Sequence, residues 1–297
     1  MNESNSAKTV HEFGGWLPLC VLPLTAVVFG DSLPAWAFMW VLAFSIYVSL
    51  KWLTWWQARG RIAHPRWRSM AYLLAWPGMD ADTFLDGSQS TPPPEAWEWL
   101  WAFVETTLGA VLLWAVARHL PERDPLIQGW VGMVGLILLL HFGLFQLLAL
   151  LWRLLGIRAE PIMRAPLRSA SLAGFWGRRW NLGFRELAHE LIFRPAHRKL
   201  GTAMAGFLVF VVSGLIHDLV ISLPSRGGYG LPTLYFVLQG TGVAIERSRL
   251  GKKLALARGV RGWCFMIVFL ATPLFWLFHP WFVMRVILPF MGVIHAL

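Results

Sequence analysis

The chain has 297 residues, of which 57% are hydrophobic and only 14% charged, and its mean hydropathy is +0.54. Soluble proteins carry about 25% charged residues, so this composition excludes a soluble globular domain and predicts a multi-pass helical membrane protein. The net charge of +10 lies in clusters between apolar segments, which is typical of cytoplasmic loops that face anionic lipid or cofactor and not of nucleic-acid binding. Cys20 and Cys264 fall within apolar segments, so we expect neither a disulfide nor a metal site from them.

The first two predicted spans cover residues 16–30 and 35–53. Residues 1–15 are polar and carry two Glu against a single Lys, so the first apolar run is interpreted as a retained span and not as a signal peptide. Several basic residues follow the second span, namely Lys51, Arg59, Arg61, Arg66 and Arg68. Because positive charge favours the cytoplasmic side, we expect the amino terminus and residues 54–96 to be cytoplasmic.

The third and fourth predicted spans cover residues 97–117 and 126–151. We expect Glu98 to lie at the membrane interface and Glu105 to bond a neighbouring helix. His141, in the fourth span, has no accompanying motif and is interpreted as structural.

Residues 152–200 contain ten Arg or Lys against three Glu, and they predict two or three amphipathic helices on the cytoplasmic face. Four further spans are expected at 202–223, 231–245, 262–278 and 281–296, with the basic residues 246–261 again inside. The predicted fold class is therefore all-α: about eight transmembrane helices with amphipathic cytoplasmic helices, in one integral membrane domain over 1–297. Both termini are expected in the cytoplasm, in a bacterial inner membrane or a eukaryotic endoplasmic reticulum membrane.

The most distinctive stretch, residues 171–221, opens with a basic-aromatic box that ends in Asn181, and His217 follows 36 residues later. We expect Gly177 in the box to allow a close backbone approach. One turn before His217 lie Ser213 and Gly214, which place a hydroxyl and a gap beside the imidazole. Intramembrane ionisable groups mark functional sites by default, although a histidine hydrogen-bonded between helices is the structural alternative.

Asp218 follows His217 directly and is turned from it by about 100° on a helix, so we expect it to bond another helix or the outer headgroup region. The sequence of the box is Phe-Trp-Gly-Arg-Arg-Trp-Asn over 175–181, and that of the second motif is Ser-Gly-Leu-Ile-His-Asp over 213–218. Together they resemble the membrane-bound O-acyltransferase superfamily, and most closely its wax synthase branch. Trp-Pro-Gly-Met-Asp at 76–80 is similar to a segment of bacterial wax-synthase-like proteins. The chain departs from the plant members in having Asp218 where Glu is usual, and it is short for the superfamily.

The resemblance implies a membrane enzyme that moves a fatty acyl group from acyl-CoA to a hydroxyl, most simply that of a long-chain alcohol, to give a wax ester. It makes His217 and Asn181 the expected catalytic residues. Six further residues are expected to bind substrate: Trp176, Arg178, Arg179, Trp180, Ser213 and Asp218. The expected partners are acyl-CoA as co-substrate, a lipid or alcohol acceptor and membrane lipids, with no bound cofactor and no metal.

The residues suit this chemistry, because a His near its ordinary pKa of about 6.5 can take the hydroxyl proton and an Asn amide can donate to the oxyanion. Sterol, glycan and secondary-metabolite hydroxyls are alternative acceptors. A proton-coupled transporter that uses Glu105, His217 and Asp218 is an alternative of another class, although no inverted repeat is visible. A non-catalytic lipid-binding scaffold is the third hypothesis for the function.

Overall fold

Helices make up the regular structure of this protein in the computed structural model, which describes residues 3–88, 91–121 and 123–297. No β-strand occurs in those residues. The predicted all-α class is therefore confirmed.

The amino-terminal helices form a hairpin. Helix α1 (Glu3–Phe29) continues through Pro18 and Pro23, and a 3₁₀ turn at Gly30–Ser32 leads into α2 (Ala35–Ala58). A Cβ on Gly30 would lie 2.3 Å from the Phe38 ring, so the tight return needs a glycine. Two short helices follow, α3 (Arg66–Ala75) and α4 (Ala81–Leu85).

Two long helical segments with π-helical turns come next. The first comprises α5 (Ala96–Ala110), the π turn η2 (Val111–Val116) and the 3₁₀ turn η3 (Ala117–His119). The second comprises α6 (Pro125–Ile137), the π turn η4 (Leu138–Leu144) and α7 (Phe145–Leu154). A Cβ on Gly109 would meet the backbone nitrogen of Leu139 at 2.5 Å, so the two segments touch backbone to backbone, as small residues allow in membrane bundles.

The carboxyl-terminal half begins with the 3₁₀ turn η5 (Pro166–Arg168) and contains a long bent helix, α10, with shorter helices around it. A left-handed Gly201, with φ of 74°, bends α10. The elements in chain order are α8 (Leu172–Arg178), α9 (Leu182–Ala188), η6 (His189–Phe193), α10 (Arg194–His217), η7 (Asp218–Ser222), α11 (Leu223–Ser225), α12 (Leu231–Arg247), α13 (Arg249–Lys253), α14 (Gly259–Ala271), α15 (Leu274–Leu277), α16 (Pro280–Phe282), η8 (Val283–Ile287) and α17 (Leu288–Val293).

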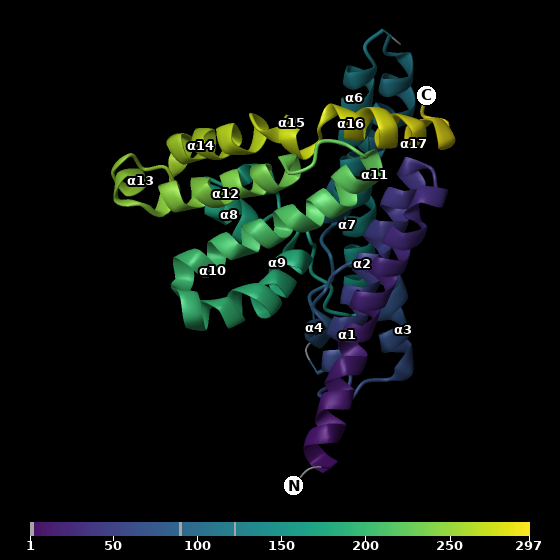
Figure 1. Cartoon of the computed structure of the whole chain (residues 1–297), viewed down its shortest axis with the longest axis vertical. Coiled ribbons are helices and arrows are strands. Elements are labelled where there is room, and N and C mark those ends of the chain that lie inside the picture. Colours follow the sequence, from purple (N-terminus) through teal and green to yellow (C-terminus); the bar gives the residue numbers. More distant parts are fainter. Residues whose placement is uncertain (1–2, 89–90, 122) are drawn as a thin grey trace.

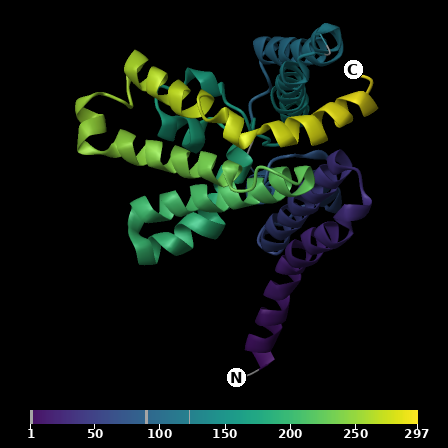
Figure 2. The ribbon, with the colours of Figure 1, turned by 45° about the horizontal axis from the view of Figure 1, so that its top comes forward.

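The two halves run in different directions. Figure 1 shows α1, α2, α6 and α7 along the long axis of the molecule, whereas α10, α12 and α14 extend across it, and Figure 2 shows the same arrangement after rotation. One buried apolar cluster joins both sets, since it contains Met39 of α2, Leu113 of η2, Phe236 of α12 and Val283 of η8. The motif residues of α8 and α10 therefore lie beside the junction of the two halves.

Six helical segments in the described part of the chain are long and apolar enough to cross a membrane: Gly14–Ser32, Ala35–Ala58, Ala96–His119, Pro125–Leu154, Leu182–Ser225 and Gly259–Leu277. The remaining two predicted spans correspond to α12, which has 17 residues, and to the shorter apolar segment Pro280–Val293. Large apolar side chains such as Leu24 (64% exposed) and Phe44 (56% exposed) project from the long segments, as lipid-facing residues do. The protein is a multi-pass helical membrane protein.

Candidate active site

The aromatic box lies on α8, a helix of two turns whose start is held by two side chains. The hydroxyl of Ser171 accepts the backbone N–H of Gly174 at 3.0 Å. The carboxylate of Glu246, which is only 3% exposed at the end of α12, accepts the backbone N–H of Leu172 at 2.5 Å. An acidic group at the start of a helix accepts hydrogen bonds from the free backbone N–H groups there, and its charge is stabilised by the helix dipole. Sequence analysis missed Glu246, because its partner lies 74 residues away and no pattern links the two.

The rings of the box form one aromatic cluster with α12. Phe175 stacks on Trp180 with centroids 5.4 Å apart, and Trp176 lies edge-on to both rings. Trp176 also contacts Phe210 of α10 at 6.1 Å and Phe236 of α12 at 5.6 Å. Contacts of this kind fix ring orientation and add stability beyond the apolar area that they bury. Trp176 is thereby directed toward the helix pair α10–α12.

Asn181 is the N-cap of α9 and lies in the left-handed region with φ of 43°. Asn is one of the residues that tolerate this conformation. Its side-chain oxygen accepts the backbone N–H of Phe184 at 3.4 Å, and its own backbone N–H points at the sulfur of Met163 at 3.3 Å. Because Oδ1 faces an N–H donor, the amide nitrogen Nδ2 points away from α9. Nδ2 makes no hydrogen bond with residues 3–88, 91–121 and 123–297. Asn181 thus offers two N–H donors to a ligand.

His217 occupies the last turn of α10. Its Nδ1 lies 2.7 Å from the carbonyl oxygen of Ser213, and its ring lies against Phe236 with centroids 4.4 Å apart. A carbonyl only accepts hydrogen bonds, so Nδ1 carries a proton, and in the neutral ring Nε2 carries the lone pair. Nε2 makes no hydrogen bond within the described residues. The half-buried ring is therefore held in an orientation that leaves Nε2 without a protein partner among the described residues.

The gap predicted beside His217 is filled. A Cβ on Gly214 would meet the Cα of Thr233 at 2.7 Å, so the backbone of α12 occupies the space that the glycine leaves. That prediction was wrong because the close helix pair was not visible from the sequence of one helix.

Asp218 bonds another helix, as predicted. Its carboxylate accepts the backbone N–H groups of Gly230 at 2.8 Å and Thr233 at 3.0 Å, and it also accepts the hydroxyls of Ser222 and Thr233. Four donors occupy its lone pairs and cap the start of α12. The geometry disfavours Asp218 as a mobile member of a proton relay.

The two arginines of the box differ in their surroundings. Arg179 donates to the carbonyl oxygens of Arg164 and Ala165, at 3.0 and 3.2 Å, and so ties the box to the preceding loop. Arg178 is exposed and makes no hydrogen bond or ion pair with the residues that the structure describes. Nothing lies within 4 Å of a Cβ on Gly177, so the expected close backbone approach there was wrong; its carbonyl instead accepts the Nε–H of Arg185 at 2.9 Å.

The structure brings some of the predicted site residues together and leaves others apart. Trp176 and His217 contact the same ring, that of Phe236, and Trp180 joins through Trp176. Asn181 follows Trp180 directly in the chain. Ser213 contributes its carbonyl to His217, while Arg179 and Asp218 are committed to backbone groups.

The other intramembrane ionisable residues stand apart from this cluster. Glu98, in the first turn of α5, accepts two hydrogen bonds from Arg153, at 2.6 and 3.1 Å. Glu105 makes no hydrogen bond in the described part of the chain, so the partner expected for it on a neighbouring helix is not found. His141 has a buried Nδ1 without a partner. Among the described residues no group of His, Cys, Asp and Glu is arranged to hold a metal.

The fold and the two motifs define a class, that of polytopic membrane proteins with an intramembrane histidine beside an aromatic box. Residues 159–238 match the model of the Membrane bound O-acyl transferase family, which confirms the resemblance seen in the motifs. That match contains both Asn181 and His217.

Named relatives give the same result. The chain is 32% identical over 159 residues to the probable long-chain-alcohol O-fatty-acyltransferase 7 of Arabidopsis thaliana, an alignment that covers 48% of this chain and 46% of the relative. It is 31% identical over 138 residues to the long-chain-alcohol O-fatty-acyltransferase of Simmondsia chinensis, with 42% and 39% covered. The chain thus spans about half the length, or less, of the curated relatives that it matches. It is similar to the wax synthase-like branch of the family.

Proposed function

We propose that this protein is an O-acyltransferase that moves a fatty acyl group from acyl-CoA to the hydroxyl of a long-chain alcohol, forming a wax ester and releasing CoA. The observation that carries the proposal is the tautomer of His217. Its Nδ1 proton is held by the Ser213 carbonyl at 2.7 Å, which leaves the Nε2 lone pair ready to accept a proton. The names of the relatives support a long-chain alcohol as acceptor.

The reaction needs one base and one oxyanion donor. Nε2 of His217 takes the hydroxyl proton as the alcohol oxygen bonds to the thioester carbonyl carbon. The carbonyl oxygen gains negative charge, and the free N–H groups of Asn181 are the donors assigned to it. When the carbon–sulfur bond breaks, the imidazolium returns the proton to the departing thiolate. The ester and the free thiol leave, and neither an acyl-enzyme nor a metal is required by these steps.

An open hollow lies close to His217 in the chain and suits apolar substrates. It has a volume of about 640 Å³ and is lined by Leu215 and Asp218, which flank the His217 position, but not by His217 itself. Four leucines and Val237 supply apolar walls, and Asp218 and Thr233 form its polar edge. An apolar channel wall binds an alkyl chain by burying its surface, at about 0.8 kcal/mol per CH₂. We assign the basic segments 153–199 and 247–261 to the CoA side, which is the cytoplasmic side in the orientation predicted from charge.

The proposal is tested with purified wild-type protein and a His217→Ala variant, given labelled palmitoyl-CoA and hexadecanol. We expect wax ester from the wild type and a loss of about 100-fold or more in the variant, because a positioned base contributes that much. His141→Ala is the matched control, since it removes an intramembrane histidine outside the aromatic cluster and should retain transfer. Equal activity in the wild type and His217→Ala would overturn the mechanism. Absence of ester with hexadecanol, but transfer to a sterol or a glycan, would replace the acceptor and keep the chemistry.

A further inference from the structure

A lysine lies buried in the interior, away from every residue used so far. Lys51 was counted among the cytoplasmic basic residues, but its side chain is only 1% exposed on α2. Its Nζ donates a hydrogen bond to the carbonyl oxygen of Gly78 and lies 3.2 Å from the centroid of the Tyr72 ring. The Tyr72 hydroxyl is in turn bonded to Thr54 of α2 at 2.8 Å. Burying a polar amino group is costly unless it is hydrogen-bonded, so its place in the interior calls for a specific purpose.

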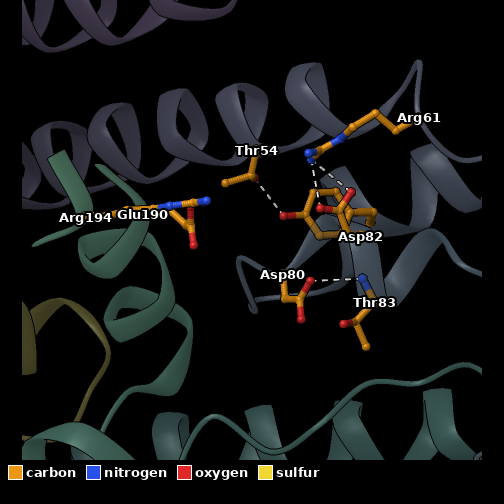
Figure 3. A network of polar contacts seen from close by, with 8 residues as sticks. Thr54, Arg61, Asp80, Asp82, Thr83, Glu190 and Arg194 are labelled. Carbon is orange, nitrogen blue, oxygen red and sulfur yellow. Dashed lines mark hydrogen bonds and ion pairs between the residues drawn. The ribbon is translucent and has the colours of Figure 1, made fainter. Parts of the chain in front are cut away.

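The carbonyl that Lys51 holds belongs to the segment 76–80, which the sequence had singled out. Its conformation is fixed at both ends: the Trp76 carbonyl accepts the Tyr47 hydroxyl at 3.2 Å, and Asp80 caps α4 by accepting the Thr83 N–H at 2.9 Å (Figure 3). Figure 3 also shows Thr54 on α2 facing this region. Lys51 binds the middle of the segment, between these two anchors.

The other side of the segment packs on the first turn of α9. A Cβ on Gly183 would lie 3.2 Å from the backbone nitrogen of Met79 and 3.6 Å from the Cα of Gly78. Gly183 is two residues after Asn181, and the segment and α9 together line a cavity of about 200 Å³ with Asp80, Leu182 and Glu186. A displacement of Gly78 and Met79 would therefore be transmitted to the turn that holds Asn181.

We propose, resting on the proposed function, that Lys51 is a positioning residue for acyl transfer: its amino group holds the 76–80 segment against α9 and thereby sets the position of Asn181. The cavity contains both arginines and carboxylates, including Arg164 and Glu160, so the segment also forms one wall of a polar chamber beside the reaction centre. Lys51 itself touches no substrate in this proposal. It acts through Gly78, Met79 and Gly183.

The kinetic test uses Lys51→Met, which keeps the length and the apolar stem but loses the amino group that donates to Gly78. We expect kcat to fall about tenfold to 100-fold, because small misplacements of a catalytic group have that effect, while the KM for hexadecanol stays within about twofold. In an Asn181→Asp background, Lys51→Met should lower kcat little further, since both residues act through the same hydrogen-bond donor. Full additivity in this double-mutant cycle, or unchanged kcat in Lys51→Met, would overturn the proposal. If Lys51→Met does not fold, Gly183→Ala provides the test. Its added methyl group presses on the backbone of Met79 from the α9 side and should lower kcat in the same way.

A second readout is independent of activity. In a Cys20→Ser, Cys264→Ser background, a cysteine is placed at Leu182, which is 8% exposed and lines the cavity. We expect Lys51→Met to raise its labelling rate by a water-soluble maleimide about fivefold or more, because the segment that covers it loosens. A cysteine at Leu250, which is 61% exposed on α13, is the control and should label equally in both forms. Unchanged labelling at position 182 would contradict the proposal even if wild-type protein transferred no acyl group, so the two failures are distinguishable.

Discussion

The side-chain oxygen of Asn181 accepts the backbone N–H of Phe184 at 3.4 Å and thereby caps α9 while its amide N–H groups stay unpaired in the described part of the chain. Capping and oxyanion donation therefore use opposite ends of one amide. An Asp keeps the capping oxygen and tolerates the left-handed conformation, but it has no N–H to donate.

We predict that Asn181→Asp folds as well as the wild type yet loses about 100-fold to 1000-fold in kcat, as when an oxyanion donor is removed. Thermal unfolding in detergent and initial rates of ester formation measure the two effects. Asn181→Gly is the companion variant, because it keeps the backbone conformation and removes both the cap and the donor. Unimpaired turnover by Asn181→Asp would assign the residue to capping alone.

Phe236 supplies the ring against which His217 lies, with 4.4 Å between the centroids, and it also contacts Trp176. We predict that Phe236→Leu lowers kcat about tenfold, because the imidazole loses the flat surface that holds its orientation. Phe265→Leu is the matched control, since Phe265 packs near the box and pairs with Phe269, whereas the ring that His217 contacts is that of Phe236. Similar losses in the two variants would show a general packing effect and not a role specific to His217.

Asp218 caps α12 through the backbone N–H groups of Gly230 and Thr233. We predict that Asp218→Asn lowers the free energy of unfolding by about 1.5–3 kcal/mol, the usual worth of hydrogen bonds to a charged group. The control is Asp31→Asn, which breaks an ion pair with Arg226 whose side chains are 88% and 65% exposed and should change stability little. Chemical or thermal unfolding in detergent provides the comparison, and equal effects of the two changes would contradict the capping role.

His279 is fully buried at the turn before α16, where its Nδ1 accepts the backbone N–H of Phe282 at 3.2 Å. Burial lowers the pKa of His279 below its ordinary value of 6.5, and this effect outweighs the nearby Asp218 carboxylate. A depressed pKa means that the neutral ring stabilises the fold above about pH 6.5, and that this stabilisation is lost as pH falls through the folded-state pKa.

We therefore predict that the midpoint of thermal unfolding decreases on acidification below pH 6.5 less steeply in His279→Asn than in the wild type. Asn keeps an oxygen that can cap the same N–H but does not titrate. Parallel pH profiles of the two proteins, recorded in one detergent, would exclude His279 as the source of the acid sensitivity.

The membrane class was predictable because long apolar runs have only one stable environment. Whether a helix spans the membrane is harder to predict when it is shorter than about 20 residues. Helix α12 is such a case, because it has 17 residues and carries polar groups near both ends. The bend at Gly201 and the π turn after His217 have no clear sequence signal, since each depends on packing with distant helices.

The candidate site residues were predictable from the two motifs, but the residues that hold those motifs in place were not. Asn181 and His217 lie in recognisable local patterns, whereas Glu246 and Lys51 have partners 74 and 27 residues away in the chain. Lys51 in particular resembles a loop charge, because it lies where an apolar run begins to acquire basic residues. Only the folded arrangement of α2 and the 76–80 segment shows that it points inward.

At Gly214 and Thr233 the backbones of α10 and α12 touch with no side chain between them, so the two helices cannot come closer at this point. His217 lies one turn after this contact and rests on the Phe236 ring of α12, so any slippage of one helix along the other would pull the base away from the ring that supports it.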